Sequence, residues 1–140
     1  MVIRRVIIIS KSVYYAHHMW KYNTNVETLE IAAITKEFPE YKIINPNGAI
    51  VENGSEKDAM NQCFNLIRNE CDILIFSTLL EGEMGKGVYS EIKLALDLKK
   101  DVYFLDRDYN FKRFTLEDYY RLEVIYFDTD SYRLYAKINY

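Results

Sequence analysis

The alternation of apolar and polar stretches along the chain predicts strands separated by helices. Short runs dominated by apolar residues, as expected for strands covered on both faces, occur at residues 6–10, 41–45, 71–77 and 101–106. Between the later runs, apolar residues recur every three or four positions, which is the spacing of an amphipathic helix. Residues 11–23 are polar and aromatic without a clear period, so we predict no regular helix there.

Local capping signals predict where two of the helices begin. Thr24 precedes Glu27 by three residues and Ser55 precedes Asp58 by three, which is the spacing of a capping box. Pro39 is expected to end the first of these helices. The first helix is expected to turn four apolar residues toward the core: Val26, Leu29, Ala33 and Ile34.

The last third of the chain departs from this alternation. The segment TLEDYYRL (115–122) predicts a short capped helix, and EVIYFD (123–128) and YRLYAKI (132–138) predict strands around the turn signal DTDS. A terminal hairpin and one further parallel strand with an edge partner both fit this pattern. With no linker or repeat, residues 1–140 form one domain. We expect a doubly wound α/β fold of Rossmann or flavodoxin type, its mainly parallel sheet covered by helices on both faces and extended by a C-terminal strand or hairpin.

Charge and cysteine content narrow the classes of partner. The net charge is −3, which gives no basic surface for a nucleic-acid polymer or an anionic membrane. The apolar run VIII near the start is too short for a signal peptide, and no segment reaches the roughly 20 apolar residues of a membrane span. Cys63 and Cys71 are the only cysteines, and their spacing matches neither a zinc site nor a CxxC redox pair. These features predict a cytoplasmic protein with two reduced thiols.

A glycine segment gives the strongest sign of a binding site. Three of the five glycines, Gly82, Gly85 and Gly87, lie between the strand at 71–77 and the next helix. Ligands of open α/β sheets bind beyond the carboxyl ends of strands, where glycines allow positive φ angles and a close approach. Glu91 follows inside the helix, and its side chain is expected to point toward the helix start. On this pattern alone, a flexible loop with a solvated Glu91 remains an alternative.

Three stretches together resemble the nucleoside 2-deoxyribosyltransferase family and its nucleotide N-glycosidase relatives. They are NECDILIFS (69–77), GKGVYSEIKLA (85–95) and KKDVYFLD (99–106), and the likeness covers roughly residues 3 to 106. Members of the family carry an acid at the start of strand three, a glycine four residues before a glutamate, an alanine four residues after it, and a Lys-x-Val strand. The matching positions here are Asp72, Gly87, Glu91, Ala95 and the segment 100–102.

The resemblance implies a mechanism on an N-glycosidic bond. Glu91 would be the nucleophile that attacks C1′ of a ribosyl or deoxyribosyl group, and another base or water would then take the sugar. Asp72 would orient the site or handle the proton of the leaving base. Tyr14 or Tyr15, in the first loop, would pack on the sugar or hold Glu91 by a phenolic hydrogen bond. We therefore expect Glu91, Asp72 and a tyrosine to face one cavity.

The same resemblance predicts the ligand and the assembly. The ligand would be a small nucleoside or nucleotide, no cofactor is expected, and a homo-oligomer would complete each pocket. Two positions depart from the family: Gly85 stands where transferases carry a second acid, and Lys93 where a glycine is common. Glu81 or Glu83 would have to replace that missing acid. The departures keep open an alternative, a non-catalytic nucleotide-binding or sensing domain on the same fold.

Several polar residues are weaker candidates for ligand contacts. Ser10 and Ser12 are candidates for phosphate contact in the first loop. Asn45 is a candidate for a base or sugar contact, although NPNG is also ordinary turn chemistry. Adjacent His17 and His18 point in different directions and lack acidic partners at a suitable spacing, so we predict no metal site.

Overall fold

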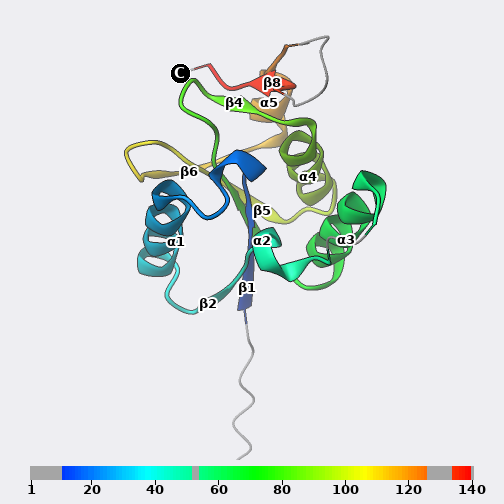
Figure 1. The fold of residues 1–140 in the computed structure, drawn as a ribbon. Coiled ribbons are helices and arrows are strands. Elements are labelled where there is room, and N and C mark those ends of the chain that lie inside the picture. Colours follow the sequence, from blue (N-terminus) through cyan, green and yellow to red (C-terminus); the bar gives the residue numbers. More distant parts are fainter. Residues whose placement is uncertain (1–10, 52–53, 126–133, 140) are drawn as a thin grey trace, which may run out of the picture.

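A five-stranded sheet forms the centre of the computed structural model, which describes residues 11–51, 54–125 and 134–139 (Figure 1). The strand order is β2-β1-β3-β5-β6. Strands β2, β1, β3 and β5 run parallel, and β6 pairs antiparallel with β5 at one edge. The strands span Lys11–Ala16 (β1), Tyr41–Ile44 (β2), Ile73–Phe76 (β3), Asp101–Leu105 (β5) and Phe111–Arg113 (β6). The predicted mainly parallel α/β sheet is confirmed.

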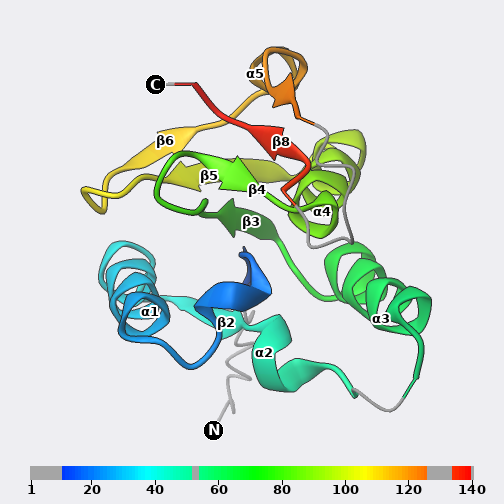
Figure 2. The same ribbon diagram turned by 45° about the horizontal axis from the view of Figure 1, so that its top comes forward.

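Helices cover both faces of this sheet (Figure 2). Helix α1 (Asn25–Glu37) packs on one face, and α3 (Glu56–Asn69) and α4 (Lys86–Asp97) pack on the other. The side chains of β1 alternate between the two cores: Val13 contributes to the α1 side and Tyr14 to the α3 and α4 side. Within the described residues, no helix is long and apolar enough to cross a membrane.

Strand β1, which lies between β2 and β3, occupies the stretch where the sequence predicted no regular helix. Residues 13–16 are all fully buried, because helices cover both faces of the sheet at this strand and β3 pairs along it. The short 3-10 helix η1 (Met19–Lys21) follows it. The predicted strand at 6–10 lies outside the described residues.

The capped helices begin where the sequence predicts, but α1 presents an unexpected face to the core. Val26 and Leu29 are 44% and 53% exposed, whereas Glu27 and Glu30 are only 6% and 5% exposed. Of the four predicted core residues of α1, Ile34 is fully buried. The prediction is wrong for Val26 and Leu29, because polar partners outside the helix draw the two glutamates inward.

The end of the chain closes over the glycine segment. Strand β8 (Ala136–Lys137) pairs antiparallel with both β4 (Glu83–Met84) and β7 (Glu123–Val124), which forms a second, three-stranded sheet. The sequence left open a terminal hairpin or one further parallel strand. The antiparallel pairing of β7 with β8 is the hairpin arrangement. The remaining elements are the short helices α2 (Pro46–Ala49) and α5 (Leu116–Tyr120), the latter begun by the Thr115 capping box.

Candidate active site around Glu91

Glu91 lies on the buried face of α4 and is 5% exposed. The helix starts at Gly85, whose extended backbone (φ −77, ψ 171) forms the N-cap. The apolar residues Val88, Ile92 and Ala95 share the buried face and fix the rotation of the helix against the sheet. This packing turns Glu91, in the second turn, toward Tyr14 in the middle of β1.

A neutral side chain holds the Glu91 carboxylate. The hydroxyl of Tyr14, which is fully buried on β1, donates a hydrogen bond to Oε2 of Glu91. Cys63 on α3 belongs to the same buried core as Tyr14. Strand β1 and helix α4, which are distant in sequence, therefore meet at one acid. The structure does bring together the glutamate and one of the two tyrosines that the sequence singles out.

Burial controls the ionisation of this group. Desolvation raises the pKa of Glu91 from 4.5 to about 7, although the hydrogen bond from Tyr14 favours the charged form. Burial and the nearby carboxylate also raise the pKa of Tyr14 far above its usual value, so the phenol remains a donor. They raise the pKa of Cys63 to about 11. The site thus holds a carboxylate that changes its charge near neutral pH, beside two groups that keep their protons.

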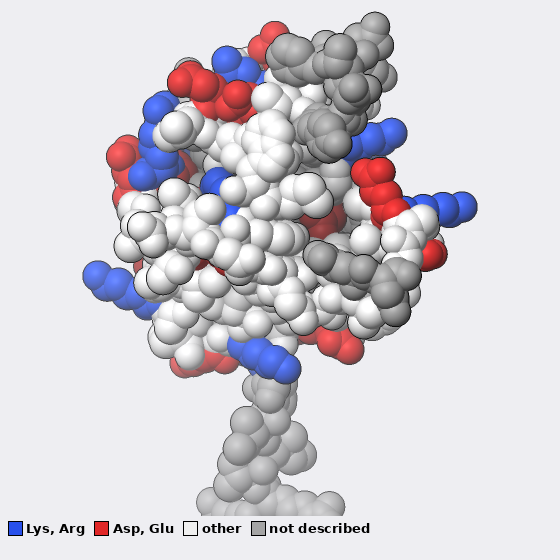
Figure 3. Space-filling view, viewed as in Figure 1, with Lys and Arg blue, Asp and Glu red and all other residues white. Residues whose placement is uncertain are grey.

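Two cavities of the structure lie away from this acid. Figure 3 shows a recess with acidic atoms at its floor, on the part of the surface where Figure 1 draws α2 and α4. A cavity of about 480 Å³ lies elsewhere, among β6, α5 and the residues after β8, and one of about 240 Å³ lies between α2 and α3. Glu91 lines neither cavity. The sequence predicted a cavity faced by both Glu91 and Asp72, and neither of these two cavities is lined by either acid.

Asp72 lies at the end of the sheet opposite to the loops that surround the start of α4. It is exposed just before β3, and its Oδ2 accepts a hydrogen bond of 2.7 Å from the backbone N–H of Ser12. The backbone N–H of Asp72 in turn donates to the carbonyl of Ser12 at 2.8 Å. An acid that precedes a parallel strand stands at the amino edge, opposite the edge where ligands bind. The structure therefore does not bring Asp72 or Ser12 to Glu91.

The glycines have more ordinary roles than the sequence suggested. Gly82 has a positive φ of 85°, which only glycine adopts easily. Gly85 is the N-cap of α4 at a negative φ, and Gly87 lies inside the first turn of the helix. A Cβ atom at Gly87 would meet only the Met60 sulfur at 3.6 Å, an ordinary contact. Positive φ is thus confirmed for Gly82 and wrong for Gly85 and Gly87.

Two further candidates have structural or undescribed positions. The Oδ1 atom of Asn45 accepts a hydrogen bond of 3.0 Å from the backbone N–H of Asn47, so Asn45 caps α2. This contact is the turn alternative that the sequence allowed. Ser10 lies outside the described residues.

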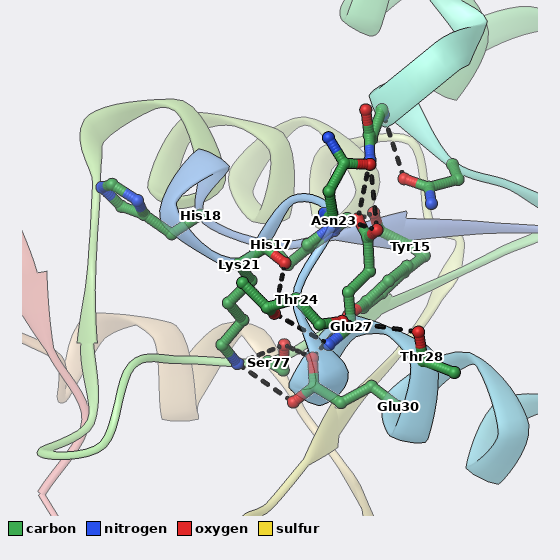
Figure 4. Close-up of polar contacts among 12 residues, drawn as sticks. Tyr15, His17, His18, Lys21, Asn23, Thr24, Glu27, Thr28, Glu30 and Ser77 are labelled. Atoms are coloured by element: carbon green, nitrogen blue, oxygen red, sulfur yellow. Dashed lines mark hydrogen bonds and ion pairs between the residues drawn. The ribbon is translucent and has the colours of Figure 1, made fainter.

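Tyr15 leads to a buried polar network on the opposite face of the sheet (Figure 4). Its hydroxyl donates to Oε1 of Glu30. Lys21 donates to Glu30 at 3.0 Å and to the Ser77 hydroxyl at 2.9 Å, and Ser77 donates to Glu30 at 2.7 Å. Ser77 is only 1% exposed, and its hydroxyl is bonded to Lys21 and Glu30 within this network.

His17 extends this network to Glu27. Its Nε2 lies 2.7 Å from Oε2 of Glu27, its Nδ1 lies 3.0 Å from the Tyr15 carbonyl, and its ring stacks on the Tyr15 ring. Asn47 donates to both Glu27 oxygens at 3.1 and 3.2 Å. The groups satisfy one another, so the network fastens the loop after β1 to α1. The sequence analysis did not predict this network. The pattern that could have indicated it is the pair of acids Glu27 and Glu30, three residues apart on a helix with many apolar residues.

No group of three or more His, Cys, Asp or Glu side chains within the described residues is arranged to hold a metal ion. Comparison of the sequence with protein-family models gives no match, and a search among characterised proteins also gives none. The family resemblance therefore stays a prediction from the sequence.

Proposed function

We propose that this protein acts on the N-glycosidic bond of a nucleoside or nucleotide, with Glu91 as the nucleophile, as in nucleoside 2-deoxyribosyltransferases. The observation that supports this most is the hydrogen bond from Tyr14 to Glu91. The resemblance places a glutamate on the helix after strand three and a tyrosine near the first strand to hold it. In the structure these two side chains are bonded across 77 positions of sequence.

The proposed reaction has two displacement steps. An oxygen of ionised Glu91 forms a bond to C1′ of the sugar while the C1′–N bond breaks, and both electrons of that bond leave with the base. The base then takes a proton from water. Water or a second base attacks C1′ of the glycosyl-enzyme, which frees the carboxylate. Tyr14 occupies one carboxylate oxygen and so directs the other toward the sugar.

Protonation of the leaving base is not assigned to Asp72. That carboxylate stands at the amino edge of the sheet and is bonded to the backbone of Ser12. Glu83 on β4 accepts a hydrogen bond of 2.8 Å from the backbone N–H of Glu81, so its carboxylate is engaged in the loop turn. Hydrolysis, in which water supplies and takes up protons, needs no further acid and is the simpler form of the reaction.

The proposal includes the fold type, the location and the assembly that the sequence predicts. The strand order β2-β1-β3-β5 supports a flavodoxin-like or Rossmann-like fold with its ligand at the β1–β3 switch point. We place the protein in the cytoplasm and expect a homo-oligomer. Met19, Trp20 and Leu80, exposed in the loops after β1 and β3, support an association surface at this edge.

Base release from a substrate panel tests the proposal. Purified protein is incubated with deoxynucleosides, ribonucleosides and their 5′-monophosphates, and free base is measured by chromatography. Glu91→Gln and Glu91→Ala are expected to abolish release while their melting temperatures show folded protein. Full activity in a folded Glu91→Ala variant would contradict the proposal. A 2′-fluoro nucleoside substrate is expected to leave a sugar adduct on Glu91, detectable by peptide mass spectrometry.

The departures from the family favour one alternative function, a nucleotide-binding or sensing domain without catalysis. Gly85 takes the place of the second acid, and Lys93 is paired with Asp97 on the surface at 2.8 Å. This alternative predicts saturable binding of a nucleotide by calorimetry without release of base from any substrate of the panel. Detectable base release excludes it.

A further inference from the structure

The larger cavity of the structure, of about 480 Å³, has no part in the proposed reaction. Its walls come from β6, from α5 and from the residues after β8, which Figure 2 shows beside one another. A volume of this size is typical of small-molecule sites, which occupy roughly 300 to 1,000 Å³. Glu91 and Tyr14 do not line it, so a ligand bound here would occupy a second site.

The inner wall of this cavity is apolar. Phe104 and Phe114 line it and are almost fully buried, and Leu122 and Ile138 line it as well. The rings of Phe104 and Phe114 both pack on the ring of Phe76, with centroids 5.1 and 4.8 Å apart. Packing on a buried neighbour fixes the two rings, so the wall can receive an apolar or aromatic group without rearrangement.

Two basic side chains line the same cavity and reach solvent. Lys112 extends from β6 and is 65% exposed, and Arg121, the residue after α5, is 71% exposed. The chain as a whole carries a net charge of −3, so this pair of cations departs from its average surface. Among the described residues that line the cavity, Asp118 is the single acid.

The charge of Asp118 is already used by helix α5. Its Oδ2 accepts hydrogen bonds of 2.9 Å from both the backbone N–H and the hydroxyl of Thr115, which form the cap of that helix. Its Oδ1 lies 4.0 Å from the nearest guanidinium nitrogen of Arg121, which is too far for a hydrogen bond. Asp118 therefore does not take the place that an anionic ligand would occupy beside Arg121.

The existing partners of the two cations hold them weakly. Nζ of Lys112 lies 3.7 Å from Oδ2 of Asp106, beyond hydrogen-bond distance. Arg121 pairs with Glu117 at 2.8 Å, and both side chains are largely exposed. Exposed ion pairs contribute little to stability, so either cation can turn to a ligand at low cost.

Arg113 also lines the cavity, but its guanidinium is held elsewhere. It donates to Asp101 at 2.6 Å, and it lies over the ring of Tyr103, 5.6 Å from the centroid. We therefore assign the recognition of charge to Lys112 and Arg121 and not to Arg113.

We propose that this cavity binds a small organic anion, a carboxylate or a phosphate ester with an apolar or aromatic body. Lys112 and Arg121 pair with the charge, since an ammonium and a guanidinium both donate strong hydrogen bonds to such oxygens. The wall of Phe104, Phe114 and Leu122 covers the body of the ligand. A free inorganic anion lacks the body and a neutral aromatic molecule lacks the charge, so each should bind less tightly.

A pair of fluorescent probes tests the two halves of the proposal. The anionic probe is 8-anilinonaphthalene-1-sulfonate, and its neutral counterpart is N-phenyl-1-naphthylamine. The native protein is expected to bind the anionic probe saturably at one site, about tenfold or more tighter than the neutral one. Lys112→Ala and Arg121→Ala are each expected to weaken the anionic probe about three- to tenfold, with little effect on the neutral probe. Melting temperatures verify that the variants are folded.

Two control variants show whether the probe binds in the cavity. Lys93 is likewise an exposed cation paired with an acid four residues away, but it does not line the cavity. Leu80 is 77% exposed in the loop after β3 and is another surface on which an apolar probe could bind. Lys93→Ala and Leu80→Ser are both expected to leave the affinity unchanged. Full affinity in the double variant Lys112→Ala/Arg121→Ala, or loss of binding in Leu80→Ser, would overturn the proposal.

NMR of the unmutated protein gives a second test and identifies the charged group. Protein labelled with ¹⁵N is titrated with phenylacetate, phenyl phosphate and inorganic phosphate. Saturable shifts are expected at the amides of Phe114, Leu122 and Ile138. Tighter binding of phenyl phosphate supports a phosphate ester as the ligand, and tighter binding of phenylacetate supports a carboxylate. Inorganic phosphate that binds as tightly as both, or shifts that are absent from these amides, would contradict the proposal.

This site does not depend on the proposed function. Glu91→Gln, which is expected to abolish base release, should bind the anionic probe as the original protein does. Binding in the cavity without base release from any substrate contradicts the proposed function alone. Base release without binding in the cavity contradicts the present proposal alone.

Discussion

Tyr14 and Tyr15 are neighbours in β1, yet their hydroxyls donate to glutamates on opposite faces of the sheet. Tyr14 bonds to Glu91 on the α4 side, and Tyr15 bonds to Glu30 on the α1 side. The alternation of a strand places the two rings back to back, each fully buried. A change of tyrosine to phenylalanine at each position therefore distinguishes an effect on the candidate site, at Tyr14, from an effect on stability, at Tyr15.

Tyr14→Phe is expected to impair base release and to raise the pKa of Glu91. The phenol stabilises the charged carboxylate, and the loss of such a hydrogen bond costs about 1–3 kcal/mol, or roughly 10- to 100-fold in rate. Measurement of kcat/KM against pH checks both effects. Unchanged kcat/KM and an unshifted profile in folded Tyr14→Phe would contradict the assignment.

Tyr15→Phe is the comparison variant and is expected to act on stability. It leaves Glu30 with one donor fewer in a buried setting, which is expected to lower the free energy of unfolding by about 1–3 kcal/mol. The titration midpoint of Glu91 should not move. Urea unfolding and carboxyl NMR measure the two quantities on the same samples.

The rate of base release is expected to rise as the pH passes through about 7. Attack on C1′ requires the ionised carboxylate, and burial raises the pKa of Glu91 to about 7. The acidic limb of the kcat/KM profile should therefore have its midpoint near neutrality and not near 4.5. A profile that is flat from pH 5 to pH 8 would contradict the raised pKa of Glu91.

Glu91 is also expected to make the unfolding free energy depend on pH. Its pKa is raised on folding, so its contribution to stability is fully present below about 4.5 and is lost as the pH rises to about 7. The loss is of the order of 3 kcal/mol between these limits. Glu91→Gln should remove this loss, so the difference in unfolding free energy between variant and original protein should change from pH 5 to pH 8. A constant difference would show that Glu91 titrates normally.

Lys21→Met is expected to destabilise the protein strongly. It removes the buried cation of Glu30, and breaking such a pair from one side costs about 3–5 kcal/mol. Lys93→Met breaks the exposed ion pair with Asp97, and a far smaller effect is expected. Urea unfolding of the two variants provides the comparison. Equal effects would mean that the buried network does not hold α1 in place.

Local signals account for the parts of the fold that the sequence predicts well. The Thr24, Ser55 and Thr115 caps lie at the starts of α1, α3 and α5, because a cap involves only neighbouring backbone groups. Strands β2, β3 and β5 also lie within the predicted apolar runs.

Long-range partners account for the differences. Glu27 is a polar residue on a helix, and partners from other segments, His17 and Asn47 among them, bring it inside. The buried state of Tyr14 likewise depends on Glu91 from a distant helix. Asp72 was misplaced for a different reason. The motif specifies an acid at this position, but the direction of β3 determines at which edge of the sheet its carboxylate lies.

Strand β8 connects residues 135–138 to the loop before α4. The backbone N–H of Ile138 donates to the Gly82 carbonyl at 2.9 Å, and that of Tyr135 donates to the Met84 carbonyl at 2.8 Å. The final residues thereby hold the loop that leads into the helix of Glu91. The position of Glu91 therefore depends on backbone hydrogen bonds from residues 135–138 as well as on the packing of α4.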